Sequence, residues 1–285
     1  METTALLPGV EAGATVLFVH AHPDDETLVT GATMAAAAAA GATVVLVTCT
    51  RGELGEVIPA ELAHLEVKAE DLAAGQIAED GLGAGLALER EKELAAALQA
   101  LGVKKHIWLG QDLAAPAQGP TTFRDSGMQW GPDGRAIAAS TILPGSFSRA
   151  PLHETAALLA AAIRALRPAA VISYAADGGY GHPDHVRTHD LTMAALSQAA
   201  GGDAAWQVPH LYAIVSDRPE RPLEDGVVRL AVAGDLAAKT AAMRAHRTQI
   251  TVEGERYALS DDVWKDISAV EEFVAIDPRT VYELP

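Results

Sequence analysis

Short apolar runs alternate along this chain with longer segments in which apolar residues recur at helical spacing. The apolar runs are rich in β-branched residues and cover residues 15–20, 43–48, 106–109, 170–174, 211–215, 227–232 and 271–276. The helical spacing is found at about 26–40, 89–101, 153–166, 184–200 and 236–246. Strands that alternate with helices of ten or more residues predict βαβ units. We therefore expect an α/β protein with a Rossmann-like, mostly parallel sheet and flanking helices.

The length of 285 residues predicts a single domain over residues 1–285. The pattern is less regular from about residue 205, which predicts a smaller C-terminal part. Residues 110–150 contain several Gly and Pro and show no clear periodicity. Because connections of that length inside a domain are usually functional or mobile, we expect this one to lie near the site.

Composition narrows the class of protein. Apolar residues make up 49% of the chain and charged residues 21%, as in an ordinary globular protein. The net charge of −17 argues against nucleic acid or an anionic membrane as a partner and favours a small molecule. Cys49 is the only cysteine, so no intrachain disulfide is possible, and its apolar surroundings predict a buried thiol.

A membrane span and a signal peptide are both disfavoured by the sequence. The nearly uncharged run from Met34 to Cys49 is divided at Gly41 into an Ala-rich helix and a β-branched strand. The first residues lack a basic region followed by an apolar stretch. We therefore expect a cytoplasmic protein.

Two short segments place imidazole and carboxylate groups directly after predicted strands. The first is Ala21–Glu26, with the sequence AHPDDE, and it follows the strand at 15–20. The second is Gly178–His185, with the sequence GGYGHPDH, and it follows the strand at 170–174. Because ligands in parallel sheets bind at the carboxyl ends of strands, we expect the two segments to form one site. Histidine and carboxylate groups in this combination predict a metal-dependent hydrolase.

Each segment also has a simpler interpretation when it is taken alone. The acidic residues of the first segment can cap a helix and complement its dipole, although this leaves His22 and Pro23 unexplained. The second segment can be a glycine-rich turn followed by a helix, with His189 one turn after His185. The two segments together favour the metal site.

Other motifs for cofactor or nucleophile chemistry are weak. Gly81–Gly85 (GLGAG) does not follow a strand, so a flexible lead-in to a helix is the better interpretation than a phosphate loop. No GxGxxG follows the first strand, and the chain contains neither GxSxG nor a P-loop.

The two segments resemble the core motifs of the PIG-L/LmbE-like N-acetylglucosaminyl deacetylases. The resemblance runs from about Val16 to Ile276 and is closest to the deacetylases of mycothiol biosynthesis, which act on N-acetylglucosaminyl-inositol. Its motifs in this sequence are FVHAHPDDETL, VTCTRGELGEV, ELAAALQALGV with Arg90 just before it, RDSGM at 124–128, GGYGHPDHVRTH and AHRTQ at 245–249.

The resemblance implies one divalent metal bound by His22, Asp25 and His185. Zn²⁺ is the metal that we expect, and Fe²⁺ also suits two imidazoles and one carboxylate. The resemblance further implies that Asp24 is the general base that takes a proton from the attacking water.

The remaining implied roles concern the carbonyl, the leaving amine and the sugar. His182, supported by Asp184, would act on the oxyanion or on the leaving amine, and Tyr180 would help to polarise the carbonyl. Arg90 and Asp125 would contact the sugar and inositol hydroxyls. The implied reaction is hydrolysis of the N-acetyl amide, with release of acetate and the free amine.

Two alternatives stay open at this point. One is an amidase that acts on mycothiol S-conjugates, or a deacetylase of another N-acetyl sugar. The conjugate amidases tend to carry a lysine shortly after the acidic cluster, where this chain has Thr27–Thr30 (TLVT), which favours the deacetylase. The other alternative is a metal- or sugar-binding protein without activity, and the presence of the whole candidate set speaks against it.

Overall fold

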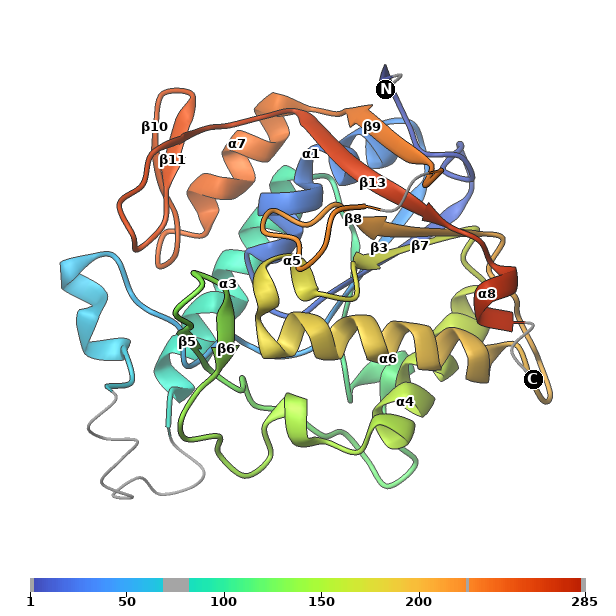
Figure 1. Cartoon of the computed structure of the whole chain (residues 1–285), viewed down its shortest axis with the longest axis horizontal. Helices are drawn as coiled ribbons and strands as arrows, with labels where there is room; N and C mark the ends of the chain where they lie inside the picture. The colour runs from blue at the N-terminus through green and yellow to red at the C-terminus, as the bar shows by residue number, and fades with distance from the viewer. Residues whose placement is uncertain (1–2, 69–81, 224–225, 283–285) are drawn as a thin grey trace.

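A central sheet of eight strands organises the residues that this computed structural model describes, namely 3–68, 82–223 and 226–282 (Figure 1). Across the sheet the strands follow the order β1-β9-β13-β8-β7-β2-β3-β4. Their bounds are β1 Thr3–Thr4, β2 Thr15–His20, β3 Thr43–Thr48, β4 Lys105–Trp108, β7 Ala170–Tyr174, β8 His210–Ile214, β9 Arg229–Ala233 and β13 Val270–Ile276. The five strands from β8 to β4 are parallel, and β13 is antiparallel to both β8 and β9. The prediction of a mostly parallel sheet is therefore confirmed.

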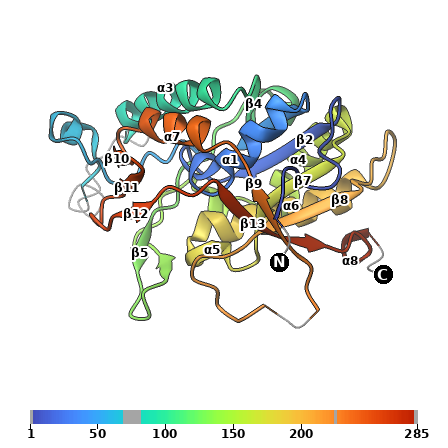
Figure 2. The same cartoon turned by 90° about the horizontal axis from the view of Figure 1, so that it is seen from above.

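Helices cover both faces of this sheet (Figure 2). Their bounds are α1 Asp25–Ala39, α3 Ala84–Ala100, α4 Leu152–Leu166, α5 Gly178–Gly181, α6 Pro183–Ala199, α7 Leu236–Ala245 and α8 Arg279–Tyr282. Three 3-10 helices lie at Ala60–Leu65, Asp112–Ala114 and Phe147–Arg149. Within the described residues, no helix combines the length and the apolar character that a membrane crossing needs.

The order of the strands creates a switch point next to β2. The chain passes from β2 to β3 and β4 on one side, and it later returns to the other side of β2 as β7 and β8. This matches the 3-2-1-4-5 order of doubly wound sheets, in which ligands bind where the direction of winding reverses. The switch point lies between β2 and β7, and these are the strands that precede the two His/Asp segments.

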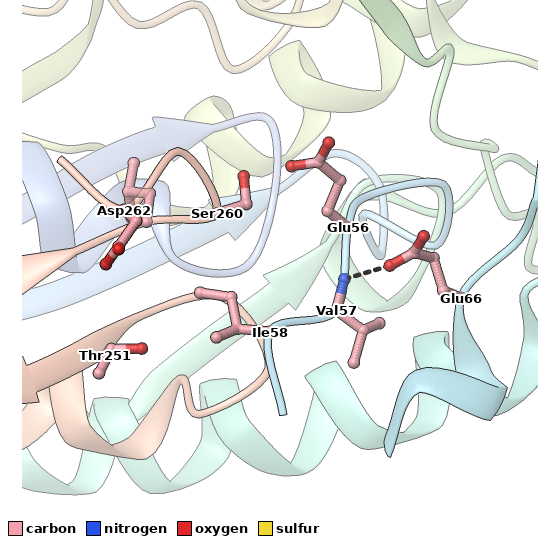
Figure 3. A pocket seen from close by; sticks show the side chains of 8 residues that line it. Glu56, Val57, Ile58, Glu66, Thr251, Ser260 and Asp262 are labelled. Atoms are coloured by element: carbon pink, nitrogen blue, oxygen red, sulfur yellow. Dashed lines mark hydrogen bonds between the residues drawn. The ribbon is translucent and has the colours of Figure 1, made fainter. Parts of the chain in front are cut away.

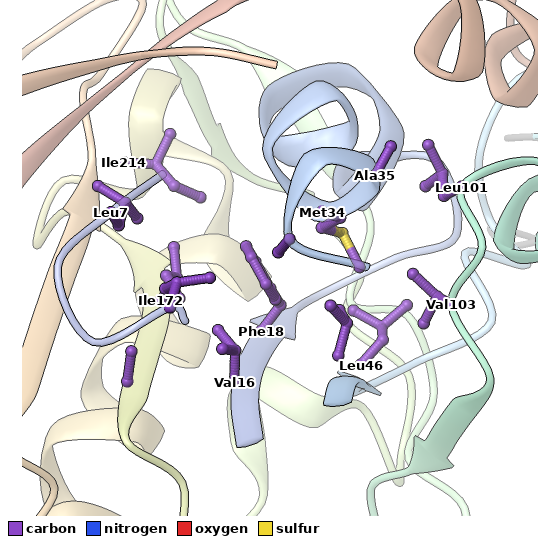
Figure 4. Packing of buried hydrophobic residues seen from close by; sticks show 14 of the residues in the cluster. Leu7, Val16, Phe18, Met34, Ala35, Leu46, Leu101, Val103, Ile172 and Ile214 are labelled. Carbon is purple, nitrogen blue, oxygen red and sulfur yellow. The ribbon is translucent and has the colours of Figure 1, made fainter. Parts of the chain in front are cut away.

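Alternate residues of the central strands pack into two separate apolar layers. Phe18 of β2 and Leu46 of β3 point to the face of α1, α3 and α7, where they meet Met34 and other buried residues (Figure 4). Leu17 of β2 points to the opposite face, which is covered by α4 and α6. Cys49 belongs to this second layer, so the prediction of a buried thiol is confirmed. Because both faces of the sheet are buried, the strands read as continuous apolar runs.

The C-terminal part is more closely joined to the sheet than the sequence indicates. It contributes β8, β9 and β13 to the central sheet, with β13 inserted between the other two. Its remaining strands form a small antiparallel sheet of β10 Thr251–Glu253, β11 Arg256–Ala258 and β12 Lys265–Asp266. Figure 1 shows this sheet beside α7 at one edge of the molecule.

Two local predictions differ from the structure. The helix expected at 89–101 begins five residues earlier, at Ala84, directly after Gly83 in the left-handed conformation (φ 73°). The flexible segment predicted before this helix, at 81–85, therefore ends at Gly83. Its first residue, Gly81, lies outside the described residues. The connection at 110–150 is not without structure, because it contains the hairpin β5 Met128–Trp130 and β6 Ala136–Ala138. Three residues per strand are too few to show an alternating pattern.

A buried ion pair joins α7, β13 and α1. Lys239 Nζ donates to Glu271 Oε1 at 2.7 Å, and both residues are buried. The Glu271 carboxylate also accepts the backbone N–H groups of Ala32 and Thr33 in α1. The pair therefore fixes the two helices to the antiparallel strand of the sheet.

We expect Lys239→Met to destabilise the protein by about 3 kcal/mol, because it leaves a buried carboxylate without its counter-ion. Urea unfolding of the variant and the parent measures this difference. A variant with the stability of the parent would show that the backbone N–H groups of α1 satisfy Glu271 by themselves.

Candidate metal centre and active site

The two His/Asp segments meet at the switch point because β2 and β7 are parallel neighbours. The register pairs Val16 with Ala170 and Phe18 with Ile172, so the two strands end at the same edge of the sheet. The first segment turns directly into α1, and the second leads through the short helix α5 into α6. The imidazole rings of His22 and His182 lie 4.6 Å apart between their centroids. The prediction that the two segments lie together is therefore confirmed by the arrangement of the strands.

The first segment is a tight turn with an unusual backbone at Asp24. Its φ of 115° and ψ of −33° lie in a region that side-chain-bearing residues rarely adopt, and such conformations cost about 1–3 kcal/mol. Asp25 begins α1, and its Oδ2 accepts the backbone N–H of His22 at 2.9 Å. This bond closes the turn and directs the carboxylate of Asp25 toward the imidazole of His22. Strained residues of this kind cluster at functional sites.

The second segment depends on glycines and on a cap at the start of α6. Gly178 has a φ of 64°, and an added Cβ would lie 2.7 Å from the backbone nitrogen of Val186, so a side chain is not tolerated there. The carbonyl of Gly178 lies 3.2 Å from His185 Nδ1. His182 Nδ1 accepts the backbone N–H of Asp184 at 3.1 Å and thereby caps α6. The other ring nitrogen of His182, Nε2, takes no part in this cap.

Asp25 lies between the two predicted histidine ligands. Its Oδ2 is 3.3 Å from His22 Nδ1, and its Oδ1 is 3.2 Å from His185 Nε2. Apart from this ion-pair contact with Asp25, the buried His185 Nε2 has no hydrogen-bond partner among the described residues, which leaves it available to a metal. Within the described residues, two sets of donor atoms lie close enough to hold one ion: His22 with His182 and His185, and His22 with Asp125 and Asp184. Two of the predicted ligands, His22 and His185, belong to the first set, whereas Asp25 belongs to neither. Imidazole and carboxylate donors of this kind suit a divalent metal.

The carboxylates around His22 give the site a strongly negative character. Burial by itself would lower the pKa of His22. Hydrogen bonds with the carboxylates of Asp184 and Asp25 oppose this effect and hold the pKa well above its usual value. Burial would raise the pKa of Asp25, but His185 and His22 hold it well below its usual range. The same carboxylate charge favours a metal cation, and ligation by His22 would require the loss of its ring proton.

The proposed general base, Asp24, has a different environment. Asp24 is partly exposed, yet the loss of hydration caused by nearby protein atoms, together with the charge of Asp25, raises its pKa to about 8. The pKa of His182 is lowered well below its usual value, first by burial and then by the neighbouring His22 and His185. Burial and the charge of Asp25 also hold the pKa of Tyr180 well above its usual value. A neutral His182 and a protonated Tyr180 are both suited to donate a hydrogen bond.

Asp184 has other partners than the sequence indicates. Its Oδ2 lies 3.3 Å from His22 Nε2 and accepts the backbone N–H of Ser126, while its Oδ1 accepts the hydroxyl of Ser126. The carboxylate therefore orients the ring of His22, and Asp184 reaches His182 only through its backbone N–H. Carboxylates that orient a ligating imidazole are a common second layer of metal sites.

The two predicted substrate contacts lie beside the cluster and are largely bonded to the protein. Asp125 Oδ1 is 3.8 Å from His22 Nε2, and the Asp125 carboxylate accepts the N–H groups of Leu54 and Gly127. The guanidinium of Arg90 is buried and donates to the carbonyls of Gly52 and Glu56. Arg90 therefore holds the segment Gly52–Glu56 in place.

Three groups near the site were not foreseen from the sequence. Glu53 is buried, its Oε2 has no hydrogen-bond partner among the described residues, and burial together with Asp125 raises its pKa to about 7. Tyr174, the last residue of β7, stacks on the ring of His185 at 4.3 Å between centroids. Ser126 bonds Asp184 as described above. The sequence marked these residues by position alone. Tyr174 ends a predicted strand, and Glu53 and Ser126 lie in two motifs that carry the family resemblance.

His189 and His20 have structural roles. His189 Nδ1 lies 2.9 Å from the carbonyl of Tyr174 and so ties α6 to β7. His20 lies between the hydroxyls of Thr30 and Tyr174, and burial lowers its pKa to about 4. Both rings are therefore explained by contacts within the fold.

A cavity of about 400 Å³ lies apart from this cluster (Figure 3). Glu66 Oε2 accepts the N–H of Val57 at its wall. None of the predicted catalytic or metal-binding residues lines it; the lining residues are Glu56, Val57, Ile58, Glu66, Thr251, Leu259, Ser260 and Asp262. The cavity is therefore not the site of the predicted chemistry.

Comparison with known proteins connects this geometry with one family. A family model described as PIG-L: GlcNAc-PI de-N-acetylase matches residues 17–196, a span that includes both His/Asp segments. A relative from Kineococcus radiotolerans, named 1D-myo-inositol 2-acetamido-2-deoxy-alpha-D-glucopyranoside deacetylase, is 43% identical over 84% of this chain and 69% of its own length. A relative of the same name from Nocardiopsis dassonvillei is 42% identical over 91% of this chain and 93% of its own length.

Solved structures share the fold at lower identity. The N,N'-diacetylchitobiose deacetylase from Pyrococcus horikoshii is similar with a TM-score of 0.54 and 21% identity, over 82% of this chain and 70% of that one. A conserved protein from Thermus thermophilus gives a TM-score of 0.51 and 24% identity, over 83% of this chain and 80% of that one.

The backbone at Asp24 generates a prediction about stability. We expect the metal-free variant Asp24→Gly to be more stable than metal-free Asp24→Ala by about 1 kcal/mol, because glycine adopts a φ of 115° without a steric penalty. Urea unfolding of both variants measures the difference. Equal stabilities would mean that Asp24 is not strained in solution.

Proposed function

The chain belongs to the PIG-L family, and we propose that it hydrolyses the N-acetyl amide of N-acetylglucosaminyl-inositol to acetate and the free amine. This is the deacetylation step of mycothiol biosynthesis. Relatives that are 37–43% identical over most of this chain carry the name of that deacetylase. The enzyme is thus a metal-dependent amide hydrolase.

One observation carries the chemistry of this proposal: the buried Nε2 of His185 lies 3.2 Å from the carboxylate of Asp25 at the switch point. We propose that His22, Asp25 and His185 hold one divalent metal there. Such a cation supplies Lewis acidity, which lowers the pKa of water toward about 7 and polarises a carbonyl. Zn²⁺ is the metal that we propose, and Fe²⁺ suits the same donors.

The protein groups around the ligands divide the proton transfers between them. Asp24 accepts the proton of the attacking water, because its carboxylate is next in the chain to a ligand and is not bonded to either histidine. Tyr180 and the Nε2–H of His182 donate hydrogen bonds to the oxygen that becomes negative during the attack. As the amide C–N bond breaks, the nitrogen takes up a proton, which Asp24 returns after having accepted it from water, while His182 keeps its Nε2–H and donates a hydrogen bond. Asp184 holds His22 in the orientation needed for ligation.

The substrate hydroxyls are recognised from the segment Gly52–Glu56 and from Asp125. The buried Oε2 of Glu53 lacks a partner, and a sugar or inositol hydroxyl would satisfy it. Arg90 contributes by holding this segment through the carbonyls of Gly52 and Glu56. Remote contacts of this kind position the amide for attack, which raises the rate for the glycoside over the free sugar.

Location and partners are part of the same proposal. The lone, buried Cys49 and the net charge of −17 suit a cytoplasmic enzyme that acts on a small neutral sugar and not on nucleic acid. The other substrates considered, a mycothiol S-conjugate or a different N-acetyl sugar, require the same metal chemistry. A panel of the three, assayed by release of amine, separates these assignments.

We expect dialysis against a strong chelator to abolish hydrolysis and added Zn²⁺ or Fe²⁺ to restore it. His185→Ala should lower the metal content measured by elemental analysis, since it removes one of three ligands. His189→Ala is the control, because that ring lies in the same helix and its Nδ1 contacts the backbone carbonyl of Tyr174. Full metal content in His185→Ala would remove His185 from the ligand set.

We expect Glu53→Ala to lower kcat/KM for the inositol glycoside by about tenfold or more and to change turnover of free N-acetylglucosamine much less. Glu91→Ala is the control, because Glu91 lies outside the cluster and pairs with Arg51. Arg90→Ala should show the same discrimination as Glu53→Ala. If the parent enzyme hydrolysed the free sugar as efficiently as the glycoside, the proposed substrate would be wrong. The proposal of metal-dependent amide hydrolysis would not be affected by that result.

A further inference from the structure

Both polar ends of the peptide bond between Pro23 and Asp24 are held by buried side chains. The carbonyl of Pro23 accepts Gln249 Nε2 at 2.7 Å. The N–H of Asp24 donates to Glu26 Oε2 at 3.0 Å. Because the carbonyl and the N–H of one peptide unit lie in a single plane, these two bonds together fix the orientation of that plane.

The second of these side chains is itself fixed by a residue far away in the sequence. Glu26 Oε1 lies 2.7 Å from His246 Nε2, and both residues are completely buried. Thr27 also donates its hydroxyl to Glu26 Oε1. His246 and Gln249 follow α7 directly, and α7 packs along α1 (Figure 2). We call Glu26, His246 and Gln249 the peptide clamp.

The clamp acts at the one position in the site where the backbone is strained. Rotation of the plane between Pro23 and Asp24 changes the φ of Asp24, which stands at 115°. A non-glycine residue returns to negative φ when nothing holds it. Such a rotation would move the carboxylate of Asp24 while Asp25, which is anchored in α1 and bonded to the N–H of His22, stayed in place.

We propose that Glu26, His246 and Gln249 are positioning residues that hold the carboxylate of Asp24 in its catalytic orientation. This inference rests on the proposed function only in so far as Asp24 is the general base. It assigns a role to the motif AHRTQ, whose contribution the metal site and the substrate contacts leave unexplained. It also assigns two functions of the turn to different residues. Metal ligation depends on His22 and Asp25, whereas the orientation of Asp24 for proton transfer depends on the clamp.

The test uses variants that loosen each half of the clamp in the full-length, zinc-loaded enzyme. Gln249→Leu removes the donor to Pro23, and His246→Ala removes the support of Glu26. We expect both variants to lose about tenfold or more in kcat, because small displacements of a catalytic group have large effects on rate. Zinc content should match that of the parent, and KM should stay within about twofold.

Two controls distinguish positioning from general loss of stability. His246→Gln places an amide N–H where the imidazole Nε2 lies, so it should restore most of kcat. Lys239→Met breaks another buried ion pair at the same helices α1 and α7, so it should lower the melting temperature and leave kcat unchanged. Should Lys239→Met lose as much kcat as Gln249→Leu, the effect would belong to packing of the helices and the inference would fall.

A double-mutant cycle identifies Asp24 as the group that the clamp acts on. Asp24→Asn alone should cost about 10²-fold in kcat, the usual size for a general base. Adding Gln249→Leu to Asp24→Asn should then cost less than about twofold, because the positioned group is already lost. Independent, multiplicative losses would overturn the inference, as would a loss of zinc in step with activity in Gln249→Leu.

A readout without catalysis keeps this inference separate from the proposed function. A crystal structure of Gln249→Leu should show the Pro23–Asp24 peptide rotated and Asp24 at negative φ, with His22 and Asp25 unmoved. An unchanged peptide plane in that structure would refute the clamp whatever the substrate is. Conversely, a parent enzyme inactive on every N-acetyl sugar would refute the proposed function, and the structure of the variant would still test the clamp.

Discussion

The parallel pairing of β2 with β7 is the constraint on which the site depends. These strands are separated by about 150 residues of sequence, yet their register brings both carboxyl ends to one edge of the sheet. Each strand then delivers a short turn whose geometry is set locally, by Asp24 in the first and by Gly178 in the second. Asp25 joins the two turns, since its carboxylate faces an imidazole from each of them. A shift of one residue in this register would exchange the faces of β2 and separate the ligands.

Several carboxylates are crowded at this edge of the sheet, and positively charged groups of the fold partly offset their electrostatic repulsion. Burial and like charge raise the pKa of both Asp24 and Glu53, and Glu53 Oε2 has no hydrogen-bond partner among the described residues. Imidazole and guanidinium groups supply part of the missing positive charge, and Arg90 does so from a position bonded to backbone carbonyls. The carboxylates at this edge therefore favour a cation, and Glu53 Oε2 can accept a hydrogen bond from a hydroxyl group.

The sequence predicted the features that leave a local signal. Apolar runs and helical spacing located the central strands and most helices, and the two His/Asp segments located the site, because ligand types recur within a few residues. The short hairpin β5–β6 escaped prediction because its strands have three residues each. The partners of Asp184 and Glu26 escaped it for a different reason. Ser126 lies 58 residues before Asp184 and His246 lies 220 residues after Glu26, and only folding brings these pairs into contact. The resemblance implied a substrate contact for Arg90, and it did not reveal that the guanidinium bonds the backbone carbonyls of Gly52 and Glu56.

The contact between Glu26 and His246 has a consequence for the order of events during synthesis. The chain emerges from the ribosome at about 5–20 residues per second, so the HPDDE turn is exposed on the order of ten seconds or more before its distant partner exists. Helix α1 and its neighbouring strands can form in that interval, but the turn at Asp24 lacks its support. A nascent chain that has not yet reached residue 249 therefore carries the first His/Asp segment without the contacts that hold its strained peptide. These contacts form only after residues 246–249 have been made.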